Sequence, residues 1–198
     1  MGTTTAPTVP LRQEGDRVSE EEYRRLALGD GGHAWELHRG RLREKPGMSV
    51  EHGDLLTEVL HVLRRQLDRN EYRLRANHAR LRRSPEHYYI PDVTVVPTAL
   101  ERALRRRPGT LDAYDQPMPL VVEIWSPSTG DYDLAEKLPE YQRRGDREIW
   151  RLHPYERTLR VWRRRLDGAY DETTYTGGVV RPAALAGVEI DLDALFES

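Results

Sequence analysis

The chain has 198 residues, enough for one domain of ordinary size, and its 37% hydrophobic and 32% charged residues indicate a lean core under a heavily charged surface. A formal net charge of −2 excludes a surface that is cationic throughout, so a polyanionic partner would need a local basic patch. The lack of cysteine excludes disulfides, thiol nucleophiles and cysteine-ligated zinc, and it fits a cytoplasmic protein.

The chain begins with a segment that we expect to be a disordered tail, residues 1–17, followed by a single domain over residues 18–198. The opening letters MGTTTAPTVPL lack the basic start and the long apolar run of a secretory signal. No stretch reaches the roughly 18 consecutive apolar residues that a membrane-spanning helix needs. We therefore expect no association with a membrane.

Three elements are predicted at the start of the domain. Ser19 and Glu22 form a capping-box pattern, which predicts a helix over residues 19–28. Short apolar runs then flank residues 38–40 in the pattern of a hairpin. Leucine and valine recur at helical spacing within residues 49–70, which predicts the clearest amphipathic helix in the chain.

The remaining elements alternate between strands and helices. Apolar runs predict strands over residues 72–83, 91–96, 120–125, 148–152 and 158–162, and an edge element over 185–196. A helix over residues 134–144 follows the capping-box-like pair Asp133 and Glu136, and a short basic helix is expected in an insertion at 99–118. This order indicates an α/β fold with a mixed β-sheet flanked by helices.

Glu123 lies in the middle of the apolar run Leu120-Val121-Val122-Glu123-Ile124-Trp125. Alternate side chains of a strand point to opposite faces, and here both faces are apolar, so the strand should be central and covered on both sides. A carboxylate at such a place costs several kcal/mol unless it is neutralised or solvated. An arginine partner, protonation or a metal ion would each achieve this, and the pattern leaves all three open.

Asp92 is a second carboxylate at the start of an apolar strand, on the face shared by Thr94 and Val96. If this strand pairs with the strand of Glu123, the two carboxylates converge. Paired carboxylates form a hard-oxygen site suited to Mg²⁺ or Mn²⁺. The alternative is that Asp92 is an ordinary turn residue after Pro91.

Lys137 lies on or beside the apolar stripe of its predicted helix, with Leu134, Leu138 and Tyr141. Lys45 and Lys137 are the only lysines in a chain that otherwise uses arginine for positive charge. A lysine retained at this position indicates that a compact ammonium group is needed, because guanidinium does not replace it. The alternative is a side chain that extends outward to Asp133, four residues earlier.

Two further polar residues stand among apolar neighbours. His52 is in the first turn of the long amphipathic helix and should face the sheet. It is either a satisfied core histidine or a ligand, phosphate contact or proton carrier at the edge of a site. Glu36, between Trp35 and Leu37, leaves the same choice open.

The chain resembles the Uma-two family of proposed restriction endonucleases, which is part of the PD-(D/E)xK nuclease superfamily. The resemblance rests on PDVTVV at 91–96, LVVEIWSPST at 120–129, YDLAEKLPEYQRRG at 132–145 and EIW at 148–150. It extends from about residue 18, through WELHRG at 35–40 and the SVEHGDLL stretch, to AGVEIDLDALF at 186–196, so it covers nearly the whole chain.

This resemblance implies a restriction-endonuclease-like core in which Asp92 and Glu123 bind Mg²⁺ or Mn²⁺. The usual lysine of the superfamily lies two residues after the Glu, where this chain has Trp125, so Lys137 on the next helix would take its place. Glu36 and His52 match further positions of the family and would complete the site.

Two positions depart from the pattern of the family. The family usually has an acidic residue where this chain has Arg39, and it often has Asp-Pro where this chain has His153 before Pro154. Neither change removes the two carboxylates, but both weaken the inference that the protein is catalytically active.

The expected function is metal-dependent hydrolysis of phosphodiester bonds in DNA, with the carbonyl of Ile124 joining Asp92 and Glu123 as metal ligands. Arginine clusters would hold the substrate: 64–65, 82–83, 105–107, 143–144 or 163–165. The alternative is a nuclease-like fold that serves as a non-catalytic nucleic-acid or protein-binding module, which the mild acidity favours. A homodimer is expected by analogy with nucleases that cut two strands.

Overall fold

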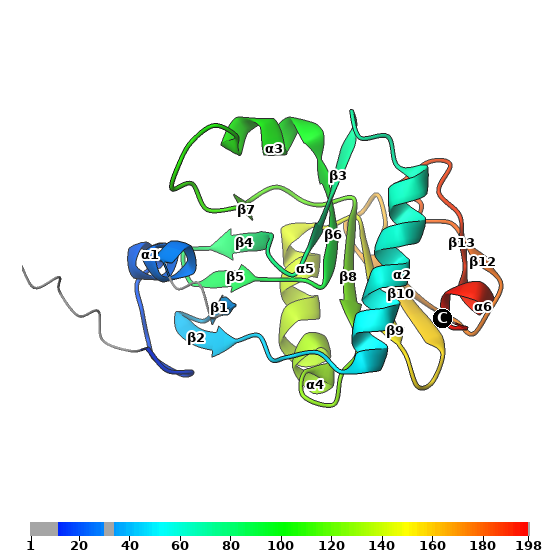
Figure 1. Ribbon diagram of the computed structural model, residues 1–198, viewed down its shortest axis with the longest axis horizontal. Coiled ribbons are helices and arrows are strands. Elements are labelled where there is room, and N and C mark those ends of the chain that lie inside the picture. The colour runs from blue at the N-terminus through cyan, green and yellow to red at the C-terminus, as the bar shows by residue number, and fades with distance from the viewer. Residues whose placement is uncertain (1–11, 30–33, 198) are drawn as a thin grey trace, which may run out of the picture.

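The computed structural model of the protein describes residues 12–29 and 34–197. Its centre is a six-stranded sheet with the order β11-β10-β9-β8-β6-β3, and a five-stranded sheet with the order β2-β1-β5-β4-β7 lies beside it (Figure 1). Strands β8 and β9 are parallel and their neighbours in the central sheet are antiparallel, so this sheet is mixed. The expected α/β fold with a mixed sheet and flanking helices is confirmed.

The strands have the following bounds. Those of the central sheet are β3 (Tyr72–Ala76), β6 (Val93–Pro97), β8 (Leu120–Ile124), β9 (Glu148–His153), β10 (Thr158–Arg164) and β11 (Tyr170–Tyr175). Those of the smaller sheet are β1 (Trp35–His38), β2 (Arg41–Glu44), β4 (Arg80–Ser84), β5 (His87–Tyr89) and β7 (Ala113–Tyr114). A separate pair is formed by β12 (Val179–Val180) and β13 (Ile190–Asp191).

The described helices are α1 (Glu20–Gly29), α2 (Val50–Gln66), α3 (Thr98–Leu104), α4 (Gly130–Tyr132), the π-helical turn η1 (Asp133–Lys137), α5 (Leu138–Arg144) and α6 (Leu192–Leu195). Helices α2 and α5 lie on opposite faces of the central sheet, and α1 packs on the smaller sheet. Within the described parts of the chain, none is long and apolar enough to cross a membrane.

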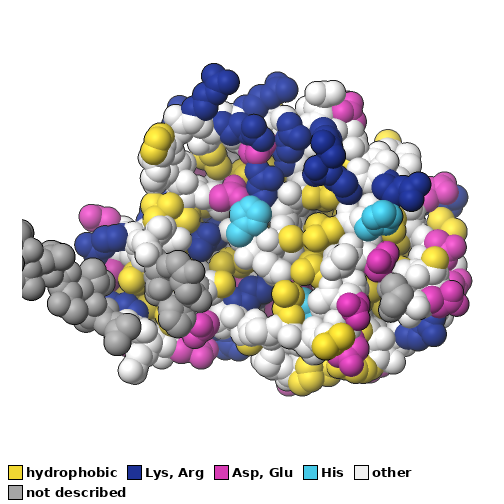
Figure 2. All heavy atoms as spheres, viewed as in Figure 1, with side chains coloured by type: hydrophobic (Ala, Val, Ile, Leu, Met, Phe, Trp, Pro, Cys, Tyr) yellow, Lys and Arg dark blue, Asp and Glu magenta, His cyan; other side chains and the backbone are white. Residues whose placement is uncertain are grey.

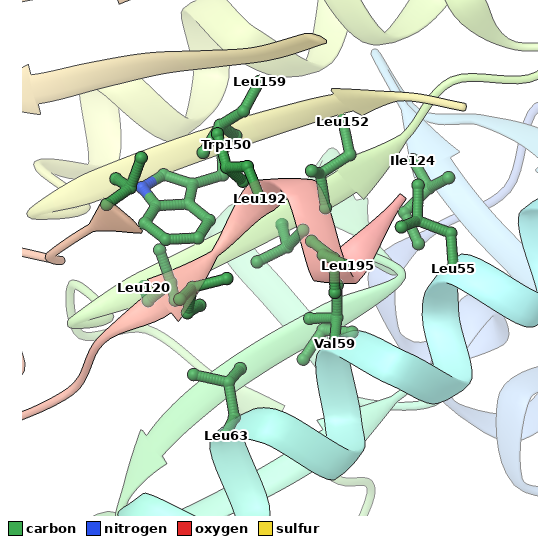
Figure 3. Packing of buried hydrophobic residues seen from close by; sticks show 14 of the residues in the cluster. Leu55, Val59, Leu63, Leu120, Ile124, Trp150, Leu152, Leu159, Leu192 and Leu195 are labelled. Carbon is green, nitrogen blue, oxygen red and sulfur yellow. The ribbon is translucent and has the colours of Figure 1, made fainter. Parts of the chain in front are cut away.

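Helix α2 covers one face of the central sheet. Its buried side chains, at the spacing expected from the sequence, contact the side chains of Leu120, Val122 and Ile124 on β8, and α6 closes the same cluster (Figure 3). Ser49 caps the start of α2 by accepting a hydrogen bond from the backbone N–H of His52. The other face of β8 presents Val121 to α5, so the strand is central and covered on both sides, as predicted.

Helix α5 continues a helical segment that starts earlier than the sequence indicates. The segment begins at Gly130, and Asp133, read from the sequence as a start signal, is a buried residue inside it. At η1 the N–H of Leu138 donates to the carbonyl of Asp133, five residues back. Pro139, which has no N–H to donate, follows this π-type bond directly, so it lies where the regular α-helical hydrogen-bond pattern is already interrupted.

Two other sequence predictions are corrected. Residues 72–83 are not one strand but two, β3 and β4, which belong to different sheets. The chain turns between them at Asn77, whose positive φ of 57° asparagine tolerates better than most residues. The tail forms the predicted edge element only in part: β13 pairs with β12 in a separate two-stranded sheet, while α6 packs on the core.

The residues before α1 also differ from the expectation of a tail up to residue 17. Arg17 forms a β-bridge with Arg41, and the N–H of Gly15 donates to the carbonyl of Leu42 at 2.8 Å. Residues 12–17 therefore lie against the β1–β2 hairpin. The rest of the predicted tail, residues 1–11, is outside the described residues.

The turn after β8 yields a prediction about stability. A Cβ added to Gly130 would lie 2.2 Å from Nε1 of Trp125, whose ring stacks on His153 at 4.3 Å. We expect Gly130→Ala to lower the free energy of unfolding by about 1–3 kcal/mol, because the indole must leave its place. Denaturant titration measures the change.

A matched control is Gly53→Ala in α2, where an added Cβ meets nothing within 4 Å. This substitution should raise the free energy of unfolding by about 0.5–1 kcal/mol, since alanine is the better helix former. Equal stability of the two variants would contradict the close packing of Trp125 on Gly130.

Candidate active site

A pocket opens at the end of β8, between the central sheet and strand β1 of the smaller sheet. The start of α2 borders it on one side, η1 on the other, and residues 44–48 between β2 and α2 lie across it. Its lining includes Glu36, Asp92, Glu123, Asp133 and Lys137. All five side chains are buried, so their charges interact with one another more strongly than they would in water.

Asp92 and Glu123 converge on one side of the sheet. Strands β6 and β8 are antiparallel neighbours, with Val93 opposite Val122. The Asp92 carboxylate accepts the backbone N–H of Ile124 at 2.7 Å, and the N–H of Asp92 lies 3.4 Å from Oε2 of Glu123. The expectation that the two strands pair and bring these carboxylates together is confirmed.

Lys137 joins three carboxylates. Its Nζ lies 3.0 Å from Oε1 of Glu36, 3.1 Å from Oε1 of Glu123 and 3.4 Å from Oδ1 of Asp133. The residue is 3% exposed, so its side chain does not extend outward to solvent, although Asp133 is one of its partners. A small head group with three donors suits this position better than a planar guanidinium.

His52 and Glu36 approach the site from opposite sides. Nε2 of His52, at the start of α2, is 3.1 Å from Oδ2 of Asp92. Glu36 comes from β1 in the smaller sheet, and its Oε1 also accepts the backbone N–H of Ile90 at 2.7 Å. The residues selected from the sequence therefore lie together: Glu36, His52, Asp92, Glu123, Ile124 and Lys137.

Three site residues were missed by the sequence reasoning. Nζ of Lys45 is 2.8 Å from Oδ1 of Asp92 and 2.9 Å from the carbonyl of Ile90. Tyr141 donates its hydroxyl to Oε1 of Glu123 at 2.6 Å, and Asp133 pairs with Lys137. The rarity of lysine was a usable signal for Lys45, because both lysines of the chain lie in this site.

Comparison with known proteins places the chain in a family. Residues 20–193 match the model of a family called Uma2 and described as "Putative restriction endonuclease". The chain belongs to the Uma2 family. A solved structure, described as "a putative nuclease belonging to DUF820 from Anabaena variabilis ATCC 29413", is similar in fold with a TM-score of 0.73 and 18% identity. The alignment covers 91% of this chain and 98% of that one. A search of curated proteins gives no match.

The two positions that depart from the Uma2 pattern have defined contacts. Arg39 occupies the hairpin turn with a positive φ of 52°, and its guanidinium donates to Glu136 at 3.2 Å. His153 stacks on Trp125 beyond the end of β8. Neither side chain contacts Asp92, Glu123 or Lys137 among the contacts of the described residues.

Carboxyl groups outnumber ammonium groups in this Uma2 site. Four carboxylates, those of Glu36, Asp92, Glu123 and Asp133, surround the ammonium groups of Lys45 and Lys137. Burial raises the pKa of Glu123 to about 8, and Asp133 and Asp92 add to the increase while Lys137 opposes it. Burial likewise raises the pKa of Asp133.

Asp92 and Lys137 are shifted the other way, toward their ionised forms. Burial opposes ionisation of Asp92, but Lys45 and the hydrogen bond from His52 outweigh it and lower the pKa of Asp92 well below its usual range. Burial would lower the pKa of Lys137, yet Glu123 and Glu36 raise it well above the ordinary value for lysine. The site thus combines a fixed carboxylate, a fixed ammonium and a carboxyl group near its protonation point.

Lys137 should contribute strongly to stability. Lys137→Met would leave three carboxylates buried without their shared cation, and we expect a loss of about 3–5 kcal/mol in the free energy of unfolding at pH 8. A carboxyl group with a raised folded pKa stabilises the fold at low pH and loses that contribution as pH rises through the folded pKa. The loss should therefore be smaller at pH 5, as denaturant titrations at both pH values would show.

Lys137→Arg is the control, because it keeps the positive charge but changes its shape. It should be less destabilised than Lys137→Met, and its deficit should not grow between pH 5 and pH 8. A Lys137→Met protein as stable as the parent at both pH values would show that the three ion pairs do not hold the site together.

Proposed function

We propose that this protein is a metal-dependent endonuclease that hydrolyses phosphodiester bonds in DNA, using Mg²⁺ or Mn²⁺. The observation that carries the proposal is the convergence of Asp92 and Glu123 next to the buried ammonium of Lys137. Three charged groups far apart in the chain meet at one pocket, in the order of the PD-(D/E)xK superfamily. Membership of the Uma2 family supports a nuclease activity.

The residues fit a divalent cation. Asp92, Glu123 and the main-chain carbonyl of Ile124 would hold it, which suits Mg²⁺ because this ion commonly takes one or two carboxylates and keeps several waters. Among residues 12–29 and 34–197, no cluster of three or more His, Asp or Glu side chains forms a metal site by itself. The excess of carboxyl groups over ammonium groups in the pocket supports the binding of a cation there.

When bound, the cation would polarise the phosphate and lower the pKa of an attacking water. Lys137 supplies a fixed positive charge beside Glu123, where it would offset negative charge that develops on the phosphate. Glu36 holds the lysine in place, and His52 orients the Asp92 carboxylate. Tyr141 fixes Oε1 of Glu123 through its hydroxyl.

The proposal predicts the loss of activity in isosteric variants. Asp92→Asn and Glu123→Gln remove one charge each with little change in shape, and each should reduce nicking of supercoiled plasmid DNA by at least about a hundredfold with Mg²⁺ or Mn²⁺. Agarose gels measure the rate. Asp54→Asn is the control, because Asp54 is exposed on α2 and lies outside the pocket lining.

Folding must be shown to be intact in each variant by circular dichroism and thermal melting. If Asp92→Asn and Glu123→Gln nick DNA as fast as Asp54→Asn, the proposed mechanism is wrong. Activity that persists in a chelator would also reject the role of the cation.

Lys45 should compete with the cation for Asp92. Its ammonium lies 2.8 Å from Oδ1 of Asp92, so removing it increases the negative charge offered to a metal ion. We expect Lys45→Met to bind Mn²⁺ at least about tenfold more tightly than the parent, which corresponds to about 1.4 kcal/mol. Isothermal titration calorimetry without DNA measures this affinity.

Lys45→Arg keeps the charge and should bind Mn²⁺ no more tightly than the parent. If Lys45→Met binds Mn²⁺ with unchanged or weaker affinity, Lys45 supports the site instead of competing for it.

A second candidate function is a non-catalytic nucleic-acid or protein-binding module. Lys45, His52 and the N–H of Ile124 already satisfy both oxygens of Asp92, which favours this alternative. The same titration separates the two functions. A module should give no Mn²⁺ heat that Asp92→Asn abolishes, in the parent or in Lys45→Met.

A further inference from the structure

One face of the molecule concentrates positive charge away from the carboxylate pocket. Figure 2 shows lysine and arginine side chains gathered over α3, β3 and the C-terminal end of α2. We term this surface the basic face and define it by nine arginines: Arg64, Arg65, Arg69, Arg73, Arg75, Arg102, Arg105, Arg106 and Arg107. The molecule as a whole has a net charge of −2, so the positive charge is segregated.

The segments that carry the basic face are joined by direct contacts. The backbone N–H of Thr98, at the start of α3, donates to the carbonyl of Glu71 at 2.8 Å. The hydroxyl of Thr98 donates to the carbonyl of Arg69 at 3.2 Å. The end of α2, the turn after it, β3 and α3 therefore form one continuous surface.

The arginines of this face fall into two groups. Arg73, Arg75 and Arg105 surround the buried carboxylate of Glu101 and are partly neutralised by it. The other six are exposed and form no ion pair with a carboxylate of the described residues: Arg64, Arg65, Arg69, Arg102, Arg106 and Arg107. The first group fixes the shape of the surface, and the second is available to an external anion.

Local structure explains only part of this charge. Arg64 and Arg65 are in the last turn of α2, where cations favour the helix dipole. The dipole gives no reason for Arg106 and Arg107, which follow α3 in a loop. Six of the nine arginines form no ion pair with a carboxylate of the described residues. Such uncompensated charge repels itself and is relieved by a polyanion.

We propose that the basic face binds the phosphate backbone of duplex DNA. Proteins that bind single-stranded nucleic acids stack the bases on exposed aromatic side chains. Among the described residues, the basic face has no exposed large hydrophobic or aromatic side chain. The same lack of exposed apolar residues disfavours a protein partner that docks by burying apolar area. An array of exposed guanidinium groups is suited to phosphates along a duplex.

The basic face would hold DNA beside the cleavage site and not at it. The carboxylate pocket is at the start of α2 and the basic face at its end, and a helix of 17 residues is about 25 Å long. This length corresponds to roughly seven base pairs at 3.4 Å each. The proposal rests on the proposed function for the choice of DNA, but the binding itself requires neither the metal nor the carboxylates.

Binding to a 30-base-pair duplex, measured by fluorescence anisotropy in EDTA over a range of salt concentrations, tests this proposal. Arg69→Ala combined with Arg107→Ala should weaken binding at least about tenfold at 0.1–0.15 M salt. It should also reduce the slope of log K against log salt by nearly two, since each phosphate contact contributes about 0.9.

The matched control is Arg147→Ala combined with Arg157→Ala, which removes two exposed arginines that form no ion pair with a carboxylate of the described residues and lie outside the basic face. Its affinity and salt slope should stay near those of the parent. Equal losses in the two double variants, or a parent that does not bind duplex DNA, would overturn the proposal.

A third protein separates this proposal from the proposed function. Glu123→Gln should bind the duplex in EDTA as the parent does, whether or not it still nicks plasmid DNA. Retained nicking would reject the catalytic mechanism and leave the basic face supported. Loss of duplex binding in Glu123→Gln would instead show that binding depends on the carboxylate pocket and would reject the basic face.

Discussion

The buried ammonium of Lys137 is the interaction on which the site depends. Three carboxylates meet at this one nitrogen, and buried charges are tolerated only when they are paired. Glu36 comes from the smaller sheet, Glu123 from the central sheet, and Asp133 from the same helical segment as the lysine. Neutralising this cluster therefore requires both sheets and η1 to come together, which links the stability of the fold to the geometry of the site.

The distribution of charge along α2 gives the molecule two different ends. At the start of the helix, four carboxylates exceed two ammonium groups, which suits a cation. Around its end and on the adjoining α3, six exposed arginines form no ion pair with a carboxylate of the described residues, which suits an anion. The net charge of −2 sums every charged residue of the chain and therefore reveals neither region. A cation-dependent reaction on a polyanion needs such a separation, since mixing the two regions would neutralise them.

The sequence predicted the local elements and the central charges, because both depend on short patterns. Glu123 and Lys137 were recognisable since each interrupts an apolar run that its neighbours define. Lys45 was passed over although lysine is rare in the chain, because its partner is 47 residues away and nothing beside it in the loop indicates burial. Asp133 was misread, since an acidic residue early in a helical pattern also signals a helix start. The division of residues 72–83 between two sheets depends on long-range pairing, which local periodicity does not encode.

The position of Glu36 limits how far the chain can be truncated while the pocket stays intact. This residue belongs to the first hairpin, which looks like a peripheral addition to the central sheet (Figure 1). Yet its carboxylate binds both the backbone of Ile90 and the ammonium of Lys137. A shortened chain that starts after the hairpin would lose a wall of the pocket along with a counter-charge. The smaller sheet is therefore an inseparable part of the smallest unit that keeps the pocket intact.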